Sequence, residues 1–187
     1  MPFLPCTSPQ RIESLGVVRS DASNCTNVAV LGSEAEFARL QAVANASAAH
    51  VVLTCLTPAM LLGGDRYPVA CAVHLRLSDA SAFGTVLLAQ AGVPAVVAAR
   101  DELLALFQED VALIGPQDNL VPLISRMRED PALRARYGRL LAGDARRRFS
   151  PRRSAIRVVD LLCAARFGVE RPAGANAVAA AARRLNR

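Results

Sequence analysis

Two histidines and five cysteines are the side chains of this sequence best suited to bind a metal ion or to act as nucleophiles. His50 and His74 each lie at the start of or within an apolar run, and Cys55 and Cys71 are the nearest thiols. A zinc site needs several such ligands at short, defined spacings, and the cysteines form no C-x-x-C pair. The spacing therefore favours structural roles for both histidines. It also favours inert, reduced thiols, which are typical of a cytoplasmic protein.

Two further segments carry groups that could bind phosphate. Gly63-Gly64-Asp65 could form a turn around a phosphate, although a glycine pair after a helix more often ends that helix. The arginines of residues 146–153 could contact a nucleic acid, but Phe149 is the one aromatic residue among them and offers little surface for stacked bases. The sequence contains no Walker loop, G-x-G-x-x-G or G-x-S-x-G motif. These observations argue against a P-loop enzyme, a serine hydrolase and a nucleic-acid-binding protein.

The 187 residues are 52% hydrophobic but only 4% aromatic, so we expect one domain with an aliphatic core. Residues 1–130 carry a net charge of −5 and residues 131–187 carry +11, which together give the net +6. A basic C-terminal part of this kind can form solvated helix faces or meet an acidic partner. No apolar stretch reaches the roughly 18 residues of a membrane-spanning helix. The first residues also lack the basic start and apolar run of a secretory signal.

Short apolar runs alternate with helical patterns, which is typical of an α/β domain with a parallel sheet and helices on both faces. Strands are predicted at residues 28–31, 50–54, 69–77, 93–98 and 111–114. Helices are predicted from residues 33, 57 and 101 onward and over residues 83–91, 118–128, 130–147 and 150–166. We therefore expect an irregular segment at residues 1–25 and a single Rossmann-like domain at residues 26–166 with a helical C-terminal extension. Residues 167–187 would form an Ala- and Arg-rich tail.

Several of these elements carry specific local signals. Ser33 with Glu36 three residues later is the pattern of a capping box. The helix that it opens should bury one side, made of Phe37, Leu40 and Val43. Asp130-Pro131 combines a capping residue with proline at the first helical position. His74 and Arg76 lie two residues apart in a predicted strand, so they should share one face and could point toward a cleft.

Four segments in order make residues 27–163 resemble the C-terminal, donor-binding half of group 1 glycosyltransferases, the retaining enzymes of the GT-B fold. Val28-Ala-Val-Leu-Gly-Ser-Glu34 is similar to the family's opening strand and glycine turn. Residues 78–84, SDASAFG, stand where the family reads S-x-x-E-G-F-G. Gly92-Val-Pro-Ala-Val-Val97 resembles the G-x-P-V-V that follows the donor helix. Asp130-Pro-Ala-Leu-Arg-Ala-Arg-Tyr-Gly138, followed by Arg148-Phe-Ser150, resembles the D-P-x-x-R-x-x-x-G … R-F-S ending.

The resemblance implies a nucleotide-sugar site above the strand ends, lined by Ser78, Ser81, Phe83, Gly84 and Thr85. It also implies two glutamates, eight residues apart, that hold the donor sugar and the nucleotide ribose. Ser81 and Ala89 stand at those two positions, and two residues are missing before Gly92. A serine supplies a hydroxyl but no carboxylate, and an alanine supplies neither. Donor hydroxyls would therefore remain unpaired, which is costly in a binding site.

Only about 25 residues precede the first predicted strand, so the acceptor-binding half that the resemblance implies has no counterpart here. We therefore expect a glycosyltransferase-like domain that is catalytically incomplete alone, with no cofactor, no metal and no assigned catalytic residue. If active, it would be a retaining glycosyltransferase that uses a nucleotide-sugar donor. The alternative is a non-enzymatic interaction module that has lost donor binding, either a homodimer or one subunit of a split glycosyltransferase.

The helix predicted at residues 150–166 is the expected interface for such a partner. Its apolar residues cover more than one helical face: Ile156, Val158, Val159, Leu161, Leu162 and Ala165. An apolar surface of this size typically marks an interface. The flanking arginines would favour an acidic partner, which residues 1–130 of a second copy could provide. We expect a homodimer or a heteromer formed through this helix.

Overall fold

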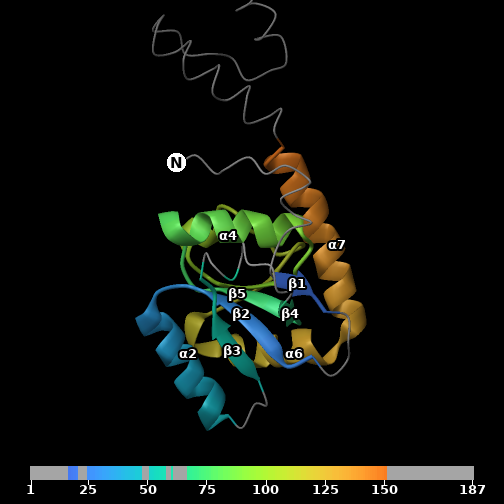
Figure 1. The fold of residues 1–187 in the computed structure, drawn as a ribbon. Helices are drawn as coiled ribbons and strands as arrows, with labels where there is room; N and C mark the ends of the chain where they lie inside the picture. Colours follow the sequence, from blue (N-terminus) through green and yellow to red (C-terminus); the bar gives the residue numbers. More distant parts are fainter. Residues whose placement is uncertain (1–16, 21–24, 48–50, 58–59, 61–66, 151–187) are drawn as a thin grey trace, which may run out of the picture.

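A five-stranded parallel sheet between two layers of helices forms the centre of the molecule (Figure 1). The computed structural model describes residues 17–20, 25–47, 51–57, 60 and 67–150. The strands lie in the order β3-β2-β5-β6-β7. They are β2 (Asn27–Leu31), β3 (Val52–Cys55), β5 (Cys71–His74), β6 (Ala95–Ala98) and β7 (Leu113–Gly115). This confirms the predicted α/β, Rossmann-like fold class.

The two helix layers cover opposite faces of the sheet (Figure 1). The helices are α2 (Glu34–Ala46), α4 (Asp79–Gln90), the single turn α5 (Asp101–Leu104), α6 (Leu120–Glu129) and α7 (Pro131–Arg148). A short 3₁₀ turn, η1 (Gln117–Asn119), precedes α6. Helices α2 and α6 pack together on one face, and α4 and α7 pack together on the other. Among the described helices, none has both the length and the apolar character that crossing a membrane requires.

Of the third predicted strand, residues 69–77, only residues 71–74 form a strand of the main sheet, and Val69 instead ends a separate short strand. β4 (Tyr67–Val69) and β5 are separated at Ala70, whose backbone N–H donates to the Asn27 carbonyl. β4 pairs in parallel with β1 (Val17–Arg19) to form a separate two-stranded sheet. β1 lies within the segment that was expected to be irregular. Its three residues carry no periodic pattern, and its partner strand is about fifty residues away in sequence, so no local signal marks it.

Helix α4 begins four residues before the predicted start at Phe83, because Ser78 and Ser81 cap its first turn. Its C-terminal end agrees with the prediction: Gly92 has a φ of 75° and reverses the chain direction. The N–H groups of Gly92 and Val93 donate to the carbonyls of Ala89 and Leu88, the bonding pattern of a Schellman turn.

Helix α2 buries a narrower strip than predicted. Leu40 is buried and Phe37 is half-buried against the core, as expected, but Val43 is 43% exposed. Glu36 and Ala44 are buried instead. Residues 36, 40 and 44 lie four apart on one line of the helix, and this line, with Phe37 beside it, faces the neighbouring elements.

Two of the predicted helices fall partly or wholly outside the described residues. The helix predicted from Thr57 is described only at Met60, whose N–H donates to Thr57 Oγ1 at 3.3 Å, consistent with capping. The helix predicted at residues 150–166 and the tail at 167–187 lie outside the described residues, apart from Ser150.

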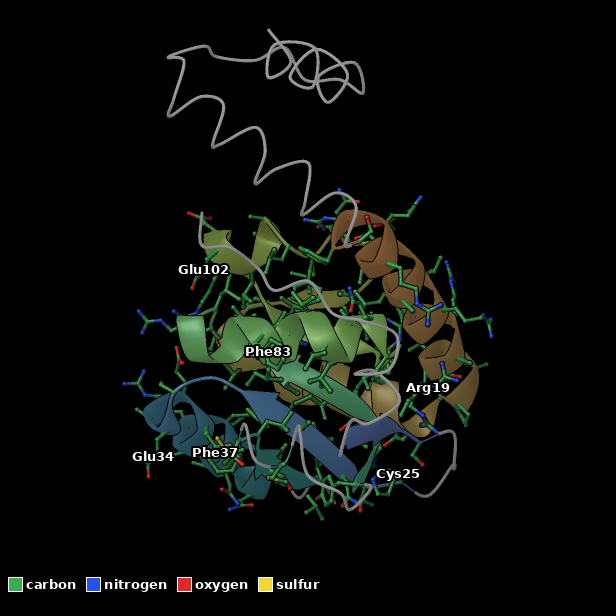
Figure 2. All side chains as sticks on the ribbon, turned by 45° about the horizontal axis from the view of Figure 1, so that its top comes forward. Arg19, Cys25, Glu34, Phe37, Phe83 and Glu102 are labelled. Carbon is green, nitrogen blue, oxygen red and sulfur yellow. The ribbon has the colours of Figure 1, made fainter. Side chains whose placement is uncertain are left out.

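Arg19 connects the small sheet to the main body. Figure 2 shows its side chain beside α7, and its guanidinium borders Gly138 of that helix.

Candidate functional site

The strand order identifies one point where ligands bind in folds of this kind. β2 and β5 are parallel neighbours, and the chain crosses to opposite faces of the sheet after them. Helix α2 follows β2 on one face, and α4 follows β5 on the other (Figure 1). In open α/β sheets, ligands occupy the carboxyl ends of the strands at such a reversal of strand order. The residues that follow β2, β5, β6 and β7 at this edge are therefore the candidates for binding.

A carboxylate at this edge joins three of these strand ends. Glu36 Oε2 accepts hydrogen bonds from Ser33 N at 3.0 Å and Ser33 Oγ at 2.8 Å. Glu36 Oε1 accepts a hydrogen bond from Arg100 Nη2 at 2.9 Å, which is also an ion pair. The same Arg100 nitrogen donates to Gln117 Oε1. These bonds link the residues that follow β2, β6 and β7, and we call Ser33, Glu36, Arg100 and Gln117 the edge cluster.

Glu36 is ionised at neutral pH although it is buried. Burial acts to raise its pKa, but the hydrogen bonds from Ser33 and the charges of Arg100 and Arg76 outweigh that effect. The resulting pKa of Glu36 lies below its usual value. At neutral pH the Glu36 carboxylate therefore carries a negative charge, and the guanidinium groups of Arg100 and Arg76 lie close enough to stabilise it.

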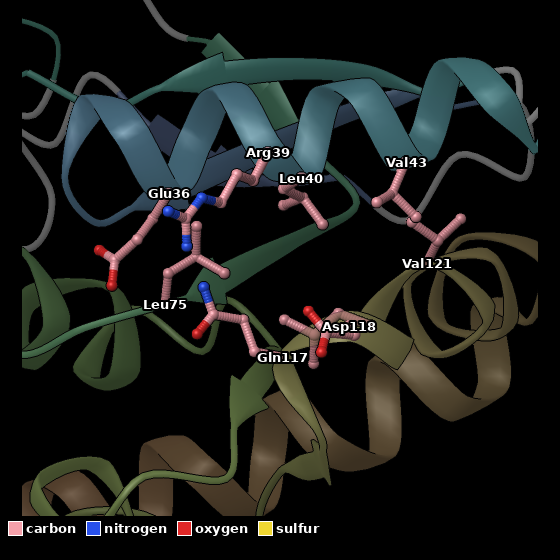
Figure 3. Close-up of a pocket in the computed structure, with 9 residues that line it drawn as sticks. Glu36, Arg39, Leu40, Val43, Leu75, Gln117, Asp118 and Val121 are labelled. Atoms are coloured by element: carbon pink, nitrogen blue, oxygen red, sulfur yellow. The ribbon is translucent and has the colours of Figure 1, made fainter.

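A small pocket lies beside the edge cluster, between α2 and α6 (Figure 3). It is lined by Glu36, Arg39, Leu40, Val43, Leu75, Gln117, Asp118, Leu120 and Val121. Its volume is about 30 Å³, which corresponds to roughly two water molecules. The pocket is therefore far too small to enclose a nucleotide sugar.

Ser78 and Ser81, two of the predicted donor-binding residues, come together at the start of α4. Ser78 Oγ accepts a hydrogen bond from Ser81 N at 3.2 Å, and Ser81 Oγ accepts one from Ser78 N at 2.8 Å. Ser81 Oγ also lies 3.1 Å from the carbonyl oxygen of Arg76 and can donate to it. Both hydroxyls therefore make the reciprocal bonds of a capping box. A ligand would have to compete with these bonds.

The remaining predicted site residues lie along the body of α4. Phe83 is half-buried and packs against the apolar cluster between α4 and the sheet (Figure 2). Gly84 and Thr85 are buried. Ala89, at the second family glutamate position, is also buried and belongs to the main core.

Sequence reasoning did not identify the edge cluster as a unit. It recognised Ser33 and Glu36 only as a helix cap, and it gave no role to Arg100 or Gln117. One available signal was position: Arg100 follows the fourth predicted strand, and Gln117 follows the Gly115-Pro116 that ends the fifth.

His74 is a buried, neutral residue that does not line an open cleft. Its Nδ1 lies 3.3 Å from Thr85 Oγ1, and its ring centroid lies 4.8 Å from that of Phe107. Burial lowers the pKa of His74 from 6.5 to about 3. Strand β5 ends at His74, and Arg76 beyond it is exposed, so the two side chains do not share an environment as the period-2 spacing had predicted. The environment of His74 agrees with a structural role, whereas His50 lies outside the described residues.

This buried histidine should make the protein less stable in mild acid. Between pH 6.5 and about 3 the unfolded chain binds a proton at His74 and the folded chain does not. The contribution of neutral His74 to the free energy of unfolding is fully present above pH 6.5, and it is lost as the pH falls from 6.5 toward 3. Acidification from about pH 7 to about pH 5 should lower the free energy of unfolding by about 2 kcal/mol through this group. Urea unfolding of both proteins at pH 7 and pH 5 should show a loss on acidification that is about 2 kcal/mol smaller in His74→Gln than in the unmodified chain. Equal losses in the two proteins would contradict the argument.

The described cysteines show no reactive or metal-binding arrangement. Cys25, Cys55 and Cys71 are free thiols. Burial raises the pKa of the Cys71 thiol to about 12, against a smaller opposing effect of Arg134. Within the described part of the chain, no three His, Cys, Asp or Glu residues lie close enough to hold a metal ion.

Comparisons with known proteins add no family to these observations. No protein-family model matches the chain, and no curated protein matches it. The arrangement of residues at the carboxyl edge is therefore the observation on which a function can be based.

Proposed function

We propose that this chain is a glycosyltransferase-like domain whose carboxyl edge binds a nucleotide sugar weakly, and that it is catalytically incomplete alone. The observation that carries the proposal is the position of Arg100 and Arg76 at the reversal of strand order. Guanidinium groups suit the oxygens of a diphosphate, because they present several donors in a fixed plane. Nucleotides bind at this position in many folds with the same sheet architecture.

The residues of the D-P-x-x-R-x-x-x-G segment support a glycosyltransferase-like architecture. Asp130 accepts a hydrogen bond from Leu133 N at 2.9 Å and caps α7, and Pro131 is its first residue. Arg134 is fully buried and donates to the carbonyls of Met127 and Arg128 at the end of α6. Gly138 lies against the turn at Gly92. Each motif residue thus has a structural reason to be present, so the motif supports the fold rather than a chemical role.

Other observations favour the second candidate, a non-enzymatic interaction module. The hydroxyls of Ser78 and Ser81 cap α4, and Ala89 belongs to the core. The pocket at the edge holds about two water molecules. The interface expected at residues 150–166 lies outside the described residues, and it stays a prediction.

Nuclear magnetic resonance of the ¹⁵N-labelled chain can decide between the two candidates. With millimolar UDP-, GDP- or ADP-sugars, we expect the amide signals of residues 32–36, 75–81 and 99–101 to move. We expect no appreciable thermal stabilisation at micromolar ligand, because stabilisation requires a ligand concentration above the dissociation constant. Arg100→Gln should reduce the shifts, whereas Arg139→Gln, which removes an exposed arginine of α7, should not.

Two outcomes would contradict the proposal. An absence of shifts at the carboxyl edge with all three donors would favour the interaction module. A thermal shift of several degrees at micromolar donor would show tight binding, which conflicts with the missing carboxylates at residues 81 and 89.

A further inference from the structure

The Glu36 carboxylate occupies donors that an anionic ligand would need. At the first strand and helix of a Rossmann-like domain, ligand phosphates accept hydrogen bonds from backbone N–H groups at the helix start. Here the N–H and hydroxyl of Ser33 both donate to Glu36 Oε2, and Arg100 donates to Glu36 Oε1. Both oxygens of the Glu36 carboxylate thus accept hydrogen bonds from donors that would otherwise be available to a phosphate group.

We propose that Glu36 is an internal competitor that keeps diphosphate groups out of the edge cluster, and that its carboxylate lowers the affinity for nucleotide sugars beyond the effect of the missing carboxylates at residues 81 and 89. The inference rests on the proposed function, because it concerns the same edge of the sheet. It assigns Glu36 a role in specificity: the site rejects a doubly charged anion unless this carboxylate moves away.

The relative exposure of the groups supports this role. Ser33 is exposed and the Arg100 side chain is 32% exposed, whereas the Glu36 side chain is 9% exposed. Solvent therefore reaches the donors from outside, while the carboxylate binds them from the protein side. A ligand phosphate approaching Arg100 would meet the negative charge of Glu36 at short range, where the repulsion between like charges is large.

Neutralising Glu36 should convert this repulsion into binding. In Glu36→Gln the side-chain oxygen can still accept from Ser33, because glutamine also serves in a capping box. The variant loses the negative charge and the ion pair with Arg100. The guanidinium groups of Arg100 and Arg76 would then face a phosphate without a competing anion.

Isothermal titration calorimetry with inorganic pyrophosphate tests the proposal. The dissociation constant of Glu36→Gln should be lower than that of the unmodified chain by about tenfold or more. Glu34→Gln is the matched control: it removes the same charge from the first turn of the same helix, but Glu34 is exposed and points away from the body (Figure 2). It should change the affinity less than about twofold. Adding Arg100→Gln to Glu36→Gln should abolish the gain.

A second variant at the same position tests whether the gain in pyrophosphate affinity comes from losing the carboxylate rather than from introducing glutamine. Glu36→Ala removes the carboxylate without a substitute and should show the same gain. If neither variant binds pyrophosphate more tightly while circular dichroism shows a folded protein, the proposal fails. It also fails if Glu34→Gln gives an equal gain, because net charge alone would then explain the effect.

The outcome is separable from that of the proposed function. Tighter pyrophosphate binding by Glu36→Gln would support the competitor role even if no nucleotide sugar binds the unmodified chain. Conversely, donor-induced shifts at the edge without any gain in the Glu36 variants would support the proposed function and overturn the competitor role.

Discussion

Replacing Gly138 with alanine should lower the free energy of unfolding by about 3 kcal/mol, because there is no space for a methyl group at this position. An added Cβ would overlap the carbonyl oxygen of Gly92 and lie 2.9 Å from Arg19 Nη1. The backbone at Gly92 cannot shift easily, because its φ of 75° closes α4 in a hydrogen-bonded turn. Helix α7 would have to move away from α4. For a chain of this length the melting temperature should fall by about 10 °C.

Gly143 provides a matched control in the same helix. It is exposed, and a Cβ added there would meet no atom within 4 Å. Gly143→Ala should therefore raise the free energy of unfolding by roughly 0.5–1 kcal/mol, the usual gain from replacing glycine inside a helix. Thermal and urea unfolding of both variants should give changes of opposite sign. Similar stabilisation by both would mean that α7 does not approach the Gly92 turn this closely in solution.

Local signals account for the parts of the fold that the sequence predicted well. The capping pattern at Ser33 and Glu36 is present with both of its hydrogen bonds. Asp130-Pro131 opens a helix, and Gly92 ends one, as expected. Each signal involves residues at most three apart, so the physical cause is contained in the segment itself.

The parts that could not be predicted depend on contacts between distant segments. The Glu36–Arg100 ion pair joins residues 64 positions apart. Strand β1 pairs with β4, about fifty residues away, and Arg100 comes from the loop after β6 to meet the Glu36 carboxylate. No period or motif within one segment specifies such pairs, because the sheet order determines which loops meet.

The candidate site likewise has a part that local sequence signals predict and a part that depends on contacts between distant segments. The resemblance led to Ser78 and Ser81, and these residues do lie at a helix start that follows a strand. Their hydroxyls cap that helix, which is a reason for serine at both positions that involves no ligand. The edge cluster required the relative positions of β2, β6 and β7, which a single sequence does not provide.

Arg134 should be the arginine of α7 whose loss destabilises the protein most. Its side chain is fully buried, and its guanidinium donates to the carbonyls of Met127 and Arg128 in the last turn of α6. The last carbonyls of an α-helix generally need partners from outside the helix, and a cation at this end also interacts favourably with the helix dipole. Arg134→Ala removes the donors and leaves a cavity. We expect the free energy of unfolding to fall by about 3–5 kcal/mol.

Two comparisons separate the hydrogen bonds from the volume of the side chain. Arg134→Met restores much of the length and apolar packing without any donor, so it should recover only part of the loss. Arg139→Ala removes an exposed arginine five residues further along α7 and should change stability by less than about 0.5 kcal/mol. If Arg134→Met is as stable as the unmodified chain in urea unfolding, the arginine acts only by filling space. The D-P-x-x-R segment would then need no cation to join α6 to α7.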